Sequence, residues 1–129
     1  MRVFKSKWFA KFARKERITN AKLCEAVRDA ERGIIDADYG GGVIKQRIAR
    51  PNEGKAGGYR SIVLFRKGER VFFVYGFAKN ALDNIDESDE RDFKELAKST
   101  LDISDMELDK LVSNGLYEEV KFDEENQNL

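Results

Sequence analysis

The sequence predicts an α+β fold in which an N-terminal helical hairpin packs on a small twisted antiparallel β-sheet, with acidic helices after the sheet. Three observations indicate this class. Apolar residues recur at helical spacing before residue 33, two runs rich in Val, Ile, Phe and Tyr lie between residues 59 and 79, and helix-capping signals return after residue 85. The chain has 129 residues, of which 41% are hydrophobic, so one domain over residues 1–129 is expected.

The helical hairpin is predicted from two amphipathic segments. A short strand over residues 2–5 can precede the first helix, expected over residues 6–17, whose apolar side carries Trp8, Phe9 and Phe12. Packing explains these aromatic residues better than base stacking does. A second helix is expected from the N-cap Thr19 to about Arg32, where Gly33 ends it.

The first strand of the sheet is expected over residues 43–50, after a flexible glycine-rich segment. Side chains alternate between the two faces of a strand, so Ile44 and Ile48 face the helical hairpin. Lys45 and Arg47 then lie about 7 Å apart on the opposite, open face.

A β-hairpin follows a glycine-rich loop at residues 51–58, whose glycines allow close approach to a phosphate. Its strands are expected over residues 59–66 and 70–79, around a turn at residues 67–69. The loop lacks the GxxxxGK[ST] spacing of a nucleotide-binding P-loop.

The turn length decides which side chains of this hairpin share a face. With an even loop, Arg60 shares a face with Tyr75, Phe77 and Lys79, whereas a three-residue bulged loop reverses the assignment.

Two acidic helices are expected after the sheet. The first covers about residues 88–100, with Asp86 as an alternative N-cap, and the second begins at a capping box formed by Ser104 and Glu107 and ends at Gly115.

The formal net charge of zero conceals a division along the chain. Residues 1–80 carry 19 Lys and Arg against 8 Asp and Glu, a charge of +11, while residues 81–129 carry 5 against 16, a charge of −11. The basic part, where we place the catalytic residues, suits a polyanion such as RNA or DNA. The acidic helical part either packs on the sheet as solvated helices, or it screens or docks near the basic concavity formed by the cations of the sheet, or it faces a basic partner.

Composition also excludes several classes of protein. Histidine is absent, which excludes His-based acid–base chemistry and Ser-His-Asp or Cys-His triads, and no acidic cluster suggests a metal site. The single cysteine, Cys24, is expected to be a buried thiol. No apolar run approaches a membrane span and no secretory signal opens the chain, so a cytoplasmic location is expected.

The candidate site is a set of cations that the predicted strands bring around one concavity: Lys45, Arg47, Arg60 and Lys79, with Lys55 on the adjoining loop. Like charges in proximity repel, so an anion or solvent is expected between them. The alternative is a solvated basic surface. Tyr75 lies near these cations and can either stack on bases or belong to the core.

The run GKAGGYR at residues 54–60 and the run VYGFAKN at residues 74–80, with a KxR strand before them, resemble the RelE superfamily of toxins in bacterial type II toxin–antitoxin systems. The similarity is greatest to the RelE/HigB-like branch and covers about residues 1–112. It implies a RelE-like fold and a ribosome-dependent mRNA interferase that cleaves message without a metal or other cofactor. The implied partners are mRNA on the ribosome and an antitoxin, commonly a helix-turn-helix protein, through which alone operator DNA is bound.

On this resemblance Arg60 is the expected clamp of the scissile phosphate, because a guanidinium holds two oxygens. Lys45 or Lys79 is the expected acid or base, and Arg47 and Lys55 position the RNA backbone. Many members place a Tyr or His near the end of the last strand. Residues 81–85 contain neither, so the acid and base roles stay open.

Two other functions remain open at this stage. One is a ParE-like toxin that inhibits DNA gyrase without cleaving RNA, and the other is a non-catalytic RNA-binding module. The cations on one face favour the nuclease, since a gyrase inhibitor has no need of a phosphate clamp.

Overall fold

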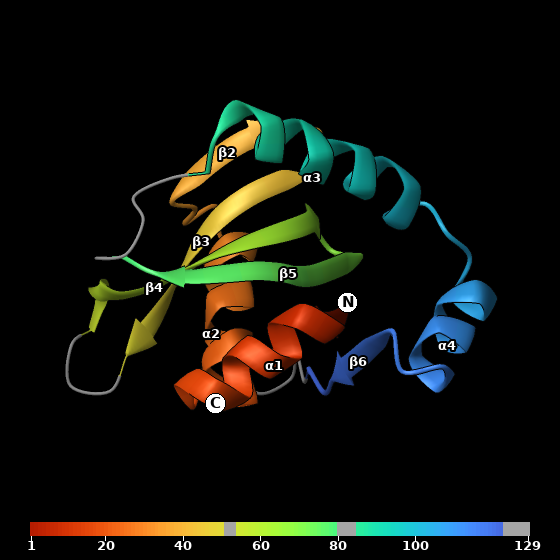
Figure 1. Ribbon diagram of the computed structural model, residues 1–129, viewed down its shortest axis with the longest axis horizontal. Coiled ribbons are helices and arrows are strands. Elements are labelled where there is room, and N and C mark those ends of the chain that lie inside the picture. Colours follow the sequence, from red (N-terminus) through yellow and green to blue (C-terminus); the bar gives the residue numbers. More distant parts are fainter. Residues whose placement is uncertain (51–53, 80–84, 123–129) are drawn as a thin grey trace.

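The computed structural model describes residues 1–50, 54–79 and 85–122, with only the backbone of residues 54–57. Six strands form one sheet in the order β2-β3-β4-β5-β1-β6 (Figure 1). In chain order the elements are β1 (Arg2–Ser6), α1 (Lys7–Glu16), α2 (Asn20–Glu31), β2 (Ala37–Gly40), β3 (Val43–Arg50), β4 (Gly54–Arg66), β5 (Arg70–Ala78), α3 (Glu87–Thr100), α4 (Asp105–Ser113) and β6 (Tyr117–Val120).

The predicted α+β class is confirmed, and so is the short strand expected before the first helix, but the description of the fold as beginning with a helical hairpin is wrong. β1 precedes the helical hairpin and lies inside the sheet, parallel to β5 and antiparallel to β6. The sheet is therefore mixed rather than antiparallel. Val3 and Phe4 on β1 are both fully buried, on opposite faces of the sheet, which explains how so short a strand holds a central position.

Helix boundaries follow the predicted capping residues closely. Thr19 accepts a hydrogen bond from the backbone N–H of Lys22, and Ser104 accepts one from that of Glu107. Between the two predicted caps of the next helix, the structure selects Asp86, whose carboxylate accepts from the N–H of Asp89. Each cap satisfies a donor that the first turn of a helix leaves unpaired.

Helices lie over both faces of the sheet (Figure 1), and each face carries an apolar core. On one face, α1 and α2 cover Ile44 and Ile48, as predicted, and they also cover Phe73. On the other face, α3 packs on Val43 and its neighbours through Ala97. The prediction that this second face is open is therefore wrong over much of its area, because Phe93, Ala97 and Leu101 form an apolar side of α3 that needs a partner.

β4 is longer than predicted. It begins at Gly54, and Gly54 pairs with Arg50 across the ladder, so the predicted loop at residues 51–58 is wrong for residues 54–58. Residues 51–53 lie outside the described residues. Three of the first five residues of β4 are glycines, and glycine has a low strand propensity, which is why the sequence predicted a loop here.

In the β4–β5 hairpin, Arg60 shares a face with Tyr75 and Phe77 as predicted for an even loop, but the turn has three residues and a bulge restores the register. Arg66 pairs with Arg70 across a three-residue turn, which puts even-numbered residues opposite even-numbered ones near the turn. A bulge at Val74 then shifts the register by one residue, so that Arg60 lies opposite Phe77. Tyr75 and Phe77 consequently share the face of Arg60.

A glycine in the VYGFAKN run allows α1 to approach β5 closely. A Cβ atom on Gly76 would lie 2.5 Å from the Phe12 ring, well inside van der Waals contact. The Phe12 ring is itself held by Trp8, at 5.5 Å between centroids, and by Tyr59, at 5.8 Å. The glycine is required here because it has no side chain, not because of its backbone conformation.

We expect Gly76→Ala to lower the free energy of unfolding by about 1–3 kcal/mol, since the added methyl group overpacks this contact. In a Phe12→Ala background the same substitution should cost much less, because the ring has gone. Urea unfolding of the four proteins of this cycle measures the coupling. An equal cost in both backgrounds would show that the Phe12 ring is not the obstacle.

Candidate functional site

Three of the predicted cations converge on one carboxylate. Lys45 and Arg47 stand two residues apart on β3, and Arg60 on β4 pairs directly across from Arg47. Asp36, just before β2, forms ion pairs with all three: its Oδ1 accepts a hydrogen bond from Arg47 Nε at 2.8 Å, and its Oδ2 lies 3.4 Å from Lys45 Nζ and 3.3 Å from Arg60 Nε. We call these four residues the Asp36 cluster.

The Asp36 cluster is mostly withdrawn from solvent. The exposed fraction of the side chain is 5% for Arg60, 10% for Asp36 and 13% for Lys45, whereas Arg47 is 49% exposed. Burial alone would raise the pKa of Asp36. The hydrogen bond from Arg47 and the charges of Lys45, Arg60 and Arg47 outweigh burial and hold the pKa of Asp36 below its ordinary value.

The backbone of Asp36 is fixed by the neighbouring strand. Its N–H donates to the Lys45 carbonyl at 3.1 Å and to the Gln46 Oε1 atom at 3.3 Å. Gln46 is buried beneath α2, where its Nε2 donates to the Ala26 carbonyl at 3.0 Å and to the Ile34 carbonyl at 2.8 Å. The carboxylate is therefore anchored through α2 and the segment that follows it.

A pocket of about 380 Å³ opens beside the Asp36 cluster, and its lining includes Asp36, Gln46 and Arg47. This places the most exposed cation of the cluster at the wall of a cavity that can admit a ligand. Among the described residues, no group of three or more His, Cys, Asp or Glu side chains is arranged to hold a metal.

The other predicted site residues lie around this centre. Lys79 follows β5 directly and is exposed, with its N–H donating to the Gly58 carbonyl. Tyr75 is half-buried and its ring stacks on Trp8 at 4.6 Å between centroids, within an aromatic group. Lys55 belongs to β4, and its side chain lies outside the described residues. The contacts described for the Asp36 cluster involve none of these three residues.

Asp36 is the site residue that sequence reasoning missed. Its segment was expected to be a flexible connection, but residues 37–40 form β2, which pairs antiparallel with β3 and brings Asp36 beside Lys45. A signal was available in the repulsion expected among the cations, since Asp36 and Asp38 are the last acidic residues before the KxR strand in the sequence.

Comparison with known proteins agrees with this arrangement of elements. The family model described as the RelE toxin of the RelE/RelB toxin–antitoxin system matches residues 1–120. The chain belongs to this family. Neither a search of curated proteins nor a search of solved structures gave a match. As a RelE family toxin, the protein is one half of a toxin–antitoxin pair, and a cognate antitoxin is its partner.

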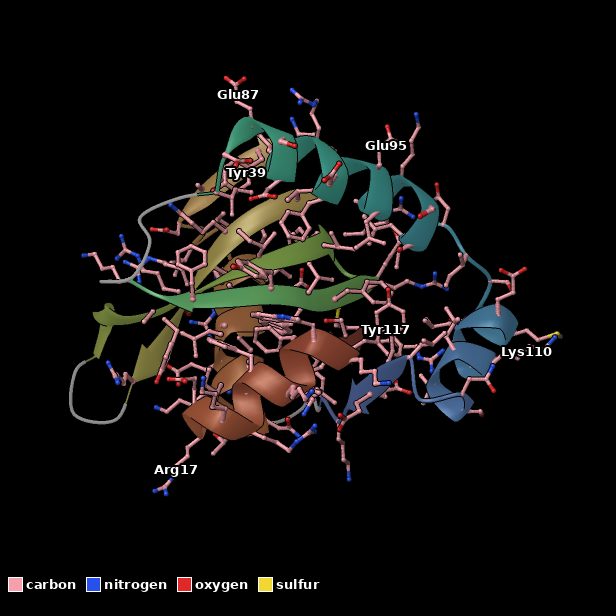
Figure 2. The ribbon with its side chains drawn as sticks, viewed as in Figure 1. Arg17, Tyr39, Glu87, Glu95, Lys110 and Tyr117 are labelled. Carbon is pink, nitrogen blue, oxygen red and sulfur yellow. The ribbon has the colours of Figure 1, made fainter. Side chains whose placement is uncertain are left out.

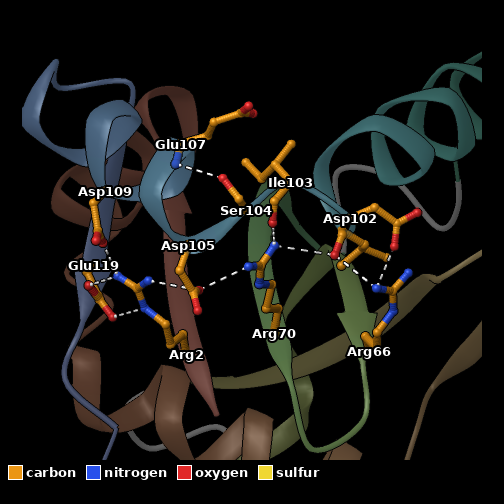
Figure 3. Close-up of polar contacts among 11 residues, drawn as sticks. Arg2, Arg66, Arg70, Asp102, Ile103, Ser104, Asp105, Glu107, Asp109 and Glu119 are labelled. Carbon is orange, nitrogen blue, oxygen red and sulfur yellow. Dashed lines mark hydrogen bonds and ion pairs between the residues drawn. The ribbon is translucent and has the colours of Figure 1, made fainter.

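The acidic C-terminal part of this RelE family toxin binds arginines of its own sheet (Figure 3). Arg2 bonds to Asp105, Asp109 and Glu119, and Arg70 donates to the Asp105 carboxylate and to the Ile103 carbonyl. The hydrogen bonds from Arg70 and Arg2 hold the pKa of Asp105 below its ordinary value. Part of the opposite charge of the two halves is thus neutralised within the molecule.

Other acidic residues face away from the sheet. Glu87 and Glu95 on α3 point outward, while Tyr39 lies beneath this helix (Figure 2). The expectation of solvated helices that pack on the sheet agrees with α3, whose outer side is a solvated surface. The alternative, that the acidic part screens the basic concavity, finds no support among the described contacts, because α4 and β6 pair with Arg2 and Arg70 instead. No described helix is long and apolar enough to cross a bilayer.

The contribution of Asp36 to the free energy of unfolding should depend on pH. We expect Asp36→Asn to lower the free energy of unfolding at pH 7, and the difference from wild type to shrink as the pH falls below about 4. The reason is that the pKa of Asp36 is lower in the folded chain, so its contribution is complete above the unfolded pKa and is lost on protonation. Urea unfolding between pH 7 and pH 3 tests this, and a difference independent of pH would contradict it.

The arginine that joins the sheet to the acidic part should matter for stability. We expect Arg70→Met to lower the free energy of unfolding by about 1–3 kcal/mol, because two backbone carbonyls and Asp105 lose a charged donor. Arg91→Met, on the exposed side of α3, is the matched control and should change stability by less than about 0.5 kcal/mol. Equal effects in thermal unfolding would contradict the assignment.

Proposed function

We propose that this RelE family toxin is a metal-independent, ribosome-dependent mRNA endoribonuclease that stops translation. The observation that carries the proposal is the convergence of Lys45, Arg47 and Arg60 on the Asp36 carboxylate. Two members of this cluster, Asp36 and Arg47, also line a pocket, together with Asp29 and Gln46 and two isoleucines. Three cations and one anion give this centre a charge of +2. A fixed, partly desolvated positive centre is what a phosphate that gains charge during a reaction requires.

The reaction we propose is a transesterification within the RNA. The ribose 2′-OH loses its proton and attacks the adjacent phosphorus, the bond from phosphorus to the 5′-oxygen breaks, and that oxygen gains a proton. The products are a 2′,3′-cyclic phosphate and a 5′-hydroxyl end. The chain's own residues need to hold the phosphate, stabilise the added negative charge and transfer two protons.

The exposures of the cations suggest how they divide these tasks. Arg47 is 49% exposed and is the guanidinium of the cluster best able to touch a phosphate oxygen. Arg60 lies directly across from Arg47 and is buried. Its positive charge therefore attracts the phosphate through a medium of low dielectric, without direct contact. Lys45 or Lys79 transfers the protons, and Lys55 and Tyr75 contact the RNA on either side of the scissile bond.

The proposal also assigns the partners. The substrate is mRNA held in the ribosomal A site, so the toxin acts in the cytoplasm. The antitoxin is of the helix-turn-helix kind and neutralises the toxin by binding it, and operator DNA is bound through the antitoxin.

Cleavage should depend on the guanidinium groups of the site. We expect Arg47→Ala and Arg60→Ala each to reduce cleavage of mRNA on programmed ribosomes at least tenfold, since loss of one stabilising donor costs roughly 2–4 kcal/mol in the transition state. Mapping of message ends after induction in cells gives the same comparison in vivo. Arg91→Ala is the control for loss of a positive charge, and thermal unfolding shows that each variant is folded.

The same experiment separates the competing functions. Message cut inside translated codons supports the nuclease. Intact message together with DNA-damage signalling indicates gyrase inhibition, and intact message that is retained on the toxin indicates an RNA-binding module. Full cleavage by a folded Arg47→Ala, Arg60→Ala double variant would remove this centre from the reaction.

A further inference from the structure

We propose that Asp36 is a positioning residue, which holds Arg47 so that the outer end of its guanidinium faces the phosphate of bound RNA. This inference rests on the proposed function, because it concerns how the same centre meets its substrate. Asp36 touches no reacting atom in this scheme and acts through the cations around it.

The geometry of the ion pair indicates this role. The Oδ1 atom of Asp36 accepts from Arg47 through Nε, at 2.8 Å. A guanidinium bound through Nε keeps its two terminal amino groups for another acceptor, and among the described contacts of Arg47 these groups have no partner. Two parallel donors on one planar group match two oxygens of a phosphate.

The second carboxylate oxygen fixes the other two cations. The Oδ2 atom lies within 3.4 Å of both Lys45 Nζ and Arg60 Nε, so one small group determines the spacing of three positive charges. Arg47 and Arg60 lie directly opposite each other as like charges on neighbouring strands, and the Asp36 carboxylate is in ion-pair contact with both. The half-exposed Arg47 is then the side chain free to turn out into solvent.

Asp36 is suited to this role because it is itself held in place. Its N–H is bonded to Lys45 and Gln46, and Gln46 is tied to α2 and to residue 34. Asp38, two residues away, also pairs with β3 through its backbone, but its side chain differs. It is exposed, and its carboxylate accepts only from the N–H of Gly40 among the described contacts.

This contrast provides a matched pair of variants. Asp36→Asn and Asp38→Asn remove the same charge from neighbouring positions, and each keeps one side-chain acceptor. We would measure cleavage on programmed ribosomes and, separately, binding of a fluorescein-labelled RNA oligonucleotide by anisotropy over a range of salt concentrations. The two measurements distinguish failure of the proposed function from failure of this inference.

The direction of the change in RNA affinity distinguishes a positioning role of Asp36 from a simple effect of net charge. Net charge alone predicts that both variants bind RNA more tightly, since each loses a negative charge. If Asp36 positions Arg47, Asp36→Asn should bind RNA more weakly and cleave it at least about tenfold more slowly. The slope of log affinity against log salt concentration should also be smaller in magnitude, by about 0.7 for one lost phosphate contact. Asp38→Asn should bind and cleave at least as well as wild type.

A second comparison tests whether Asp36 acts through Arg47. In an Arg47→Ala background, Asp36→Asn should cause little further loss of RNA binding, whereas an independent role would give additive losses. If Asp36→Asn does not fold, Asp36→Glu retains the charge and displaces the carboxylate by one methylene group. It should still lose cleavage at least about tenfold while its thermal unfolding stays near that of wild type.

Tighter binding or faster cleavage by Asp36→Asn would overturn the inference, because Asp36 would then be masking the cations. Failure of wild type to bind RNA would overturn it as well. If wild type binds RNA but does not cleave it, the nuclease proposal fails, and weaker binding by Asp36→Asn alone still supports the positioning role.

Discussion

Arg47 and Arg60 lie directly opposite each other on neighbouring strands, and the arrangement of the site depends on how their repulsion is offset. Like charges at such a position destabilise a sheet, and burial of Arg60 increases the cost. Asp36 supplies one negative charge that all the cations of the cluster share. The site therefore retains excess positive charge in a fixed arrangement, which a purely solvated basic surface would not provide.

The two apolar faces of the sheet explain how that centre is supported. α1 and α2 cover one face, and α3 covers part of the other, so the strands that carry the cations are held from both sides. Arg2 and Arg70 fasten the acidic C-terminal part to the far end of the same sheet. The acidic part is thus an integral part of the fold, and its charge is directed to arginines outside the Asp36 cluster.

Features set by local sequence were predictable, and features set by distant pairing were not. Thr19 and Ser104 cap their helices because a side chain and a backbone N–H three residues later suffice. The position of β1 beside β5, by contrast, depends on residues about 70 positions apart. Likewise, the clustering of Lys45, Arg47 and Arg60 followed from strand alternation. Asp36 joins them only because β2 pairs with β3, and the sequence of residues 36–40 gives no clear signal for a strand.

The place of β1 also has a consequence for biosynthesis. Its neighbours are β5 and β6, so β1 has both of its partners only when residues 117–120 have emerged from the ribosome. Domains built from such distant contacts complete late and fold slowly. A nascent chain of this toxin therefore lacks its finished sheet until β6 has been made, although the strands that carry the Asp36 cluster precede β6 in the sequence.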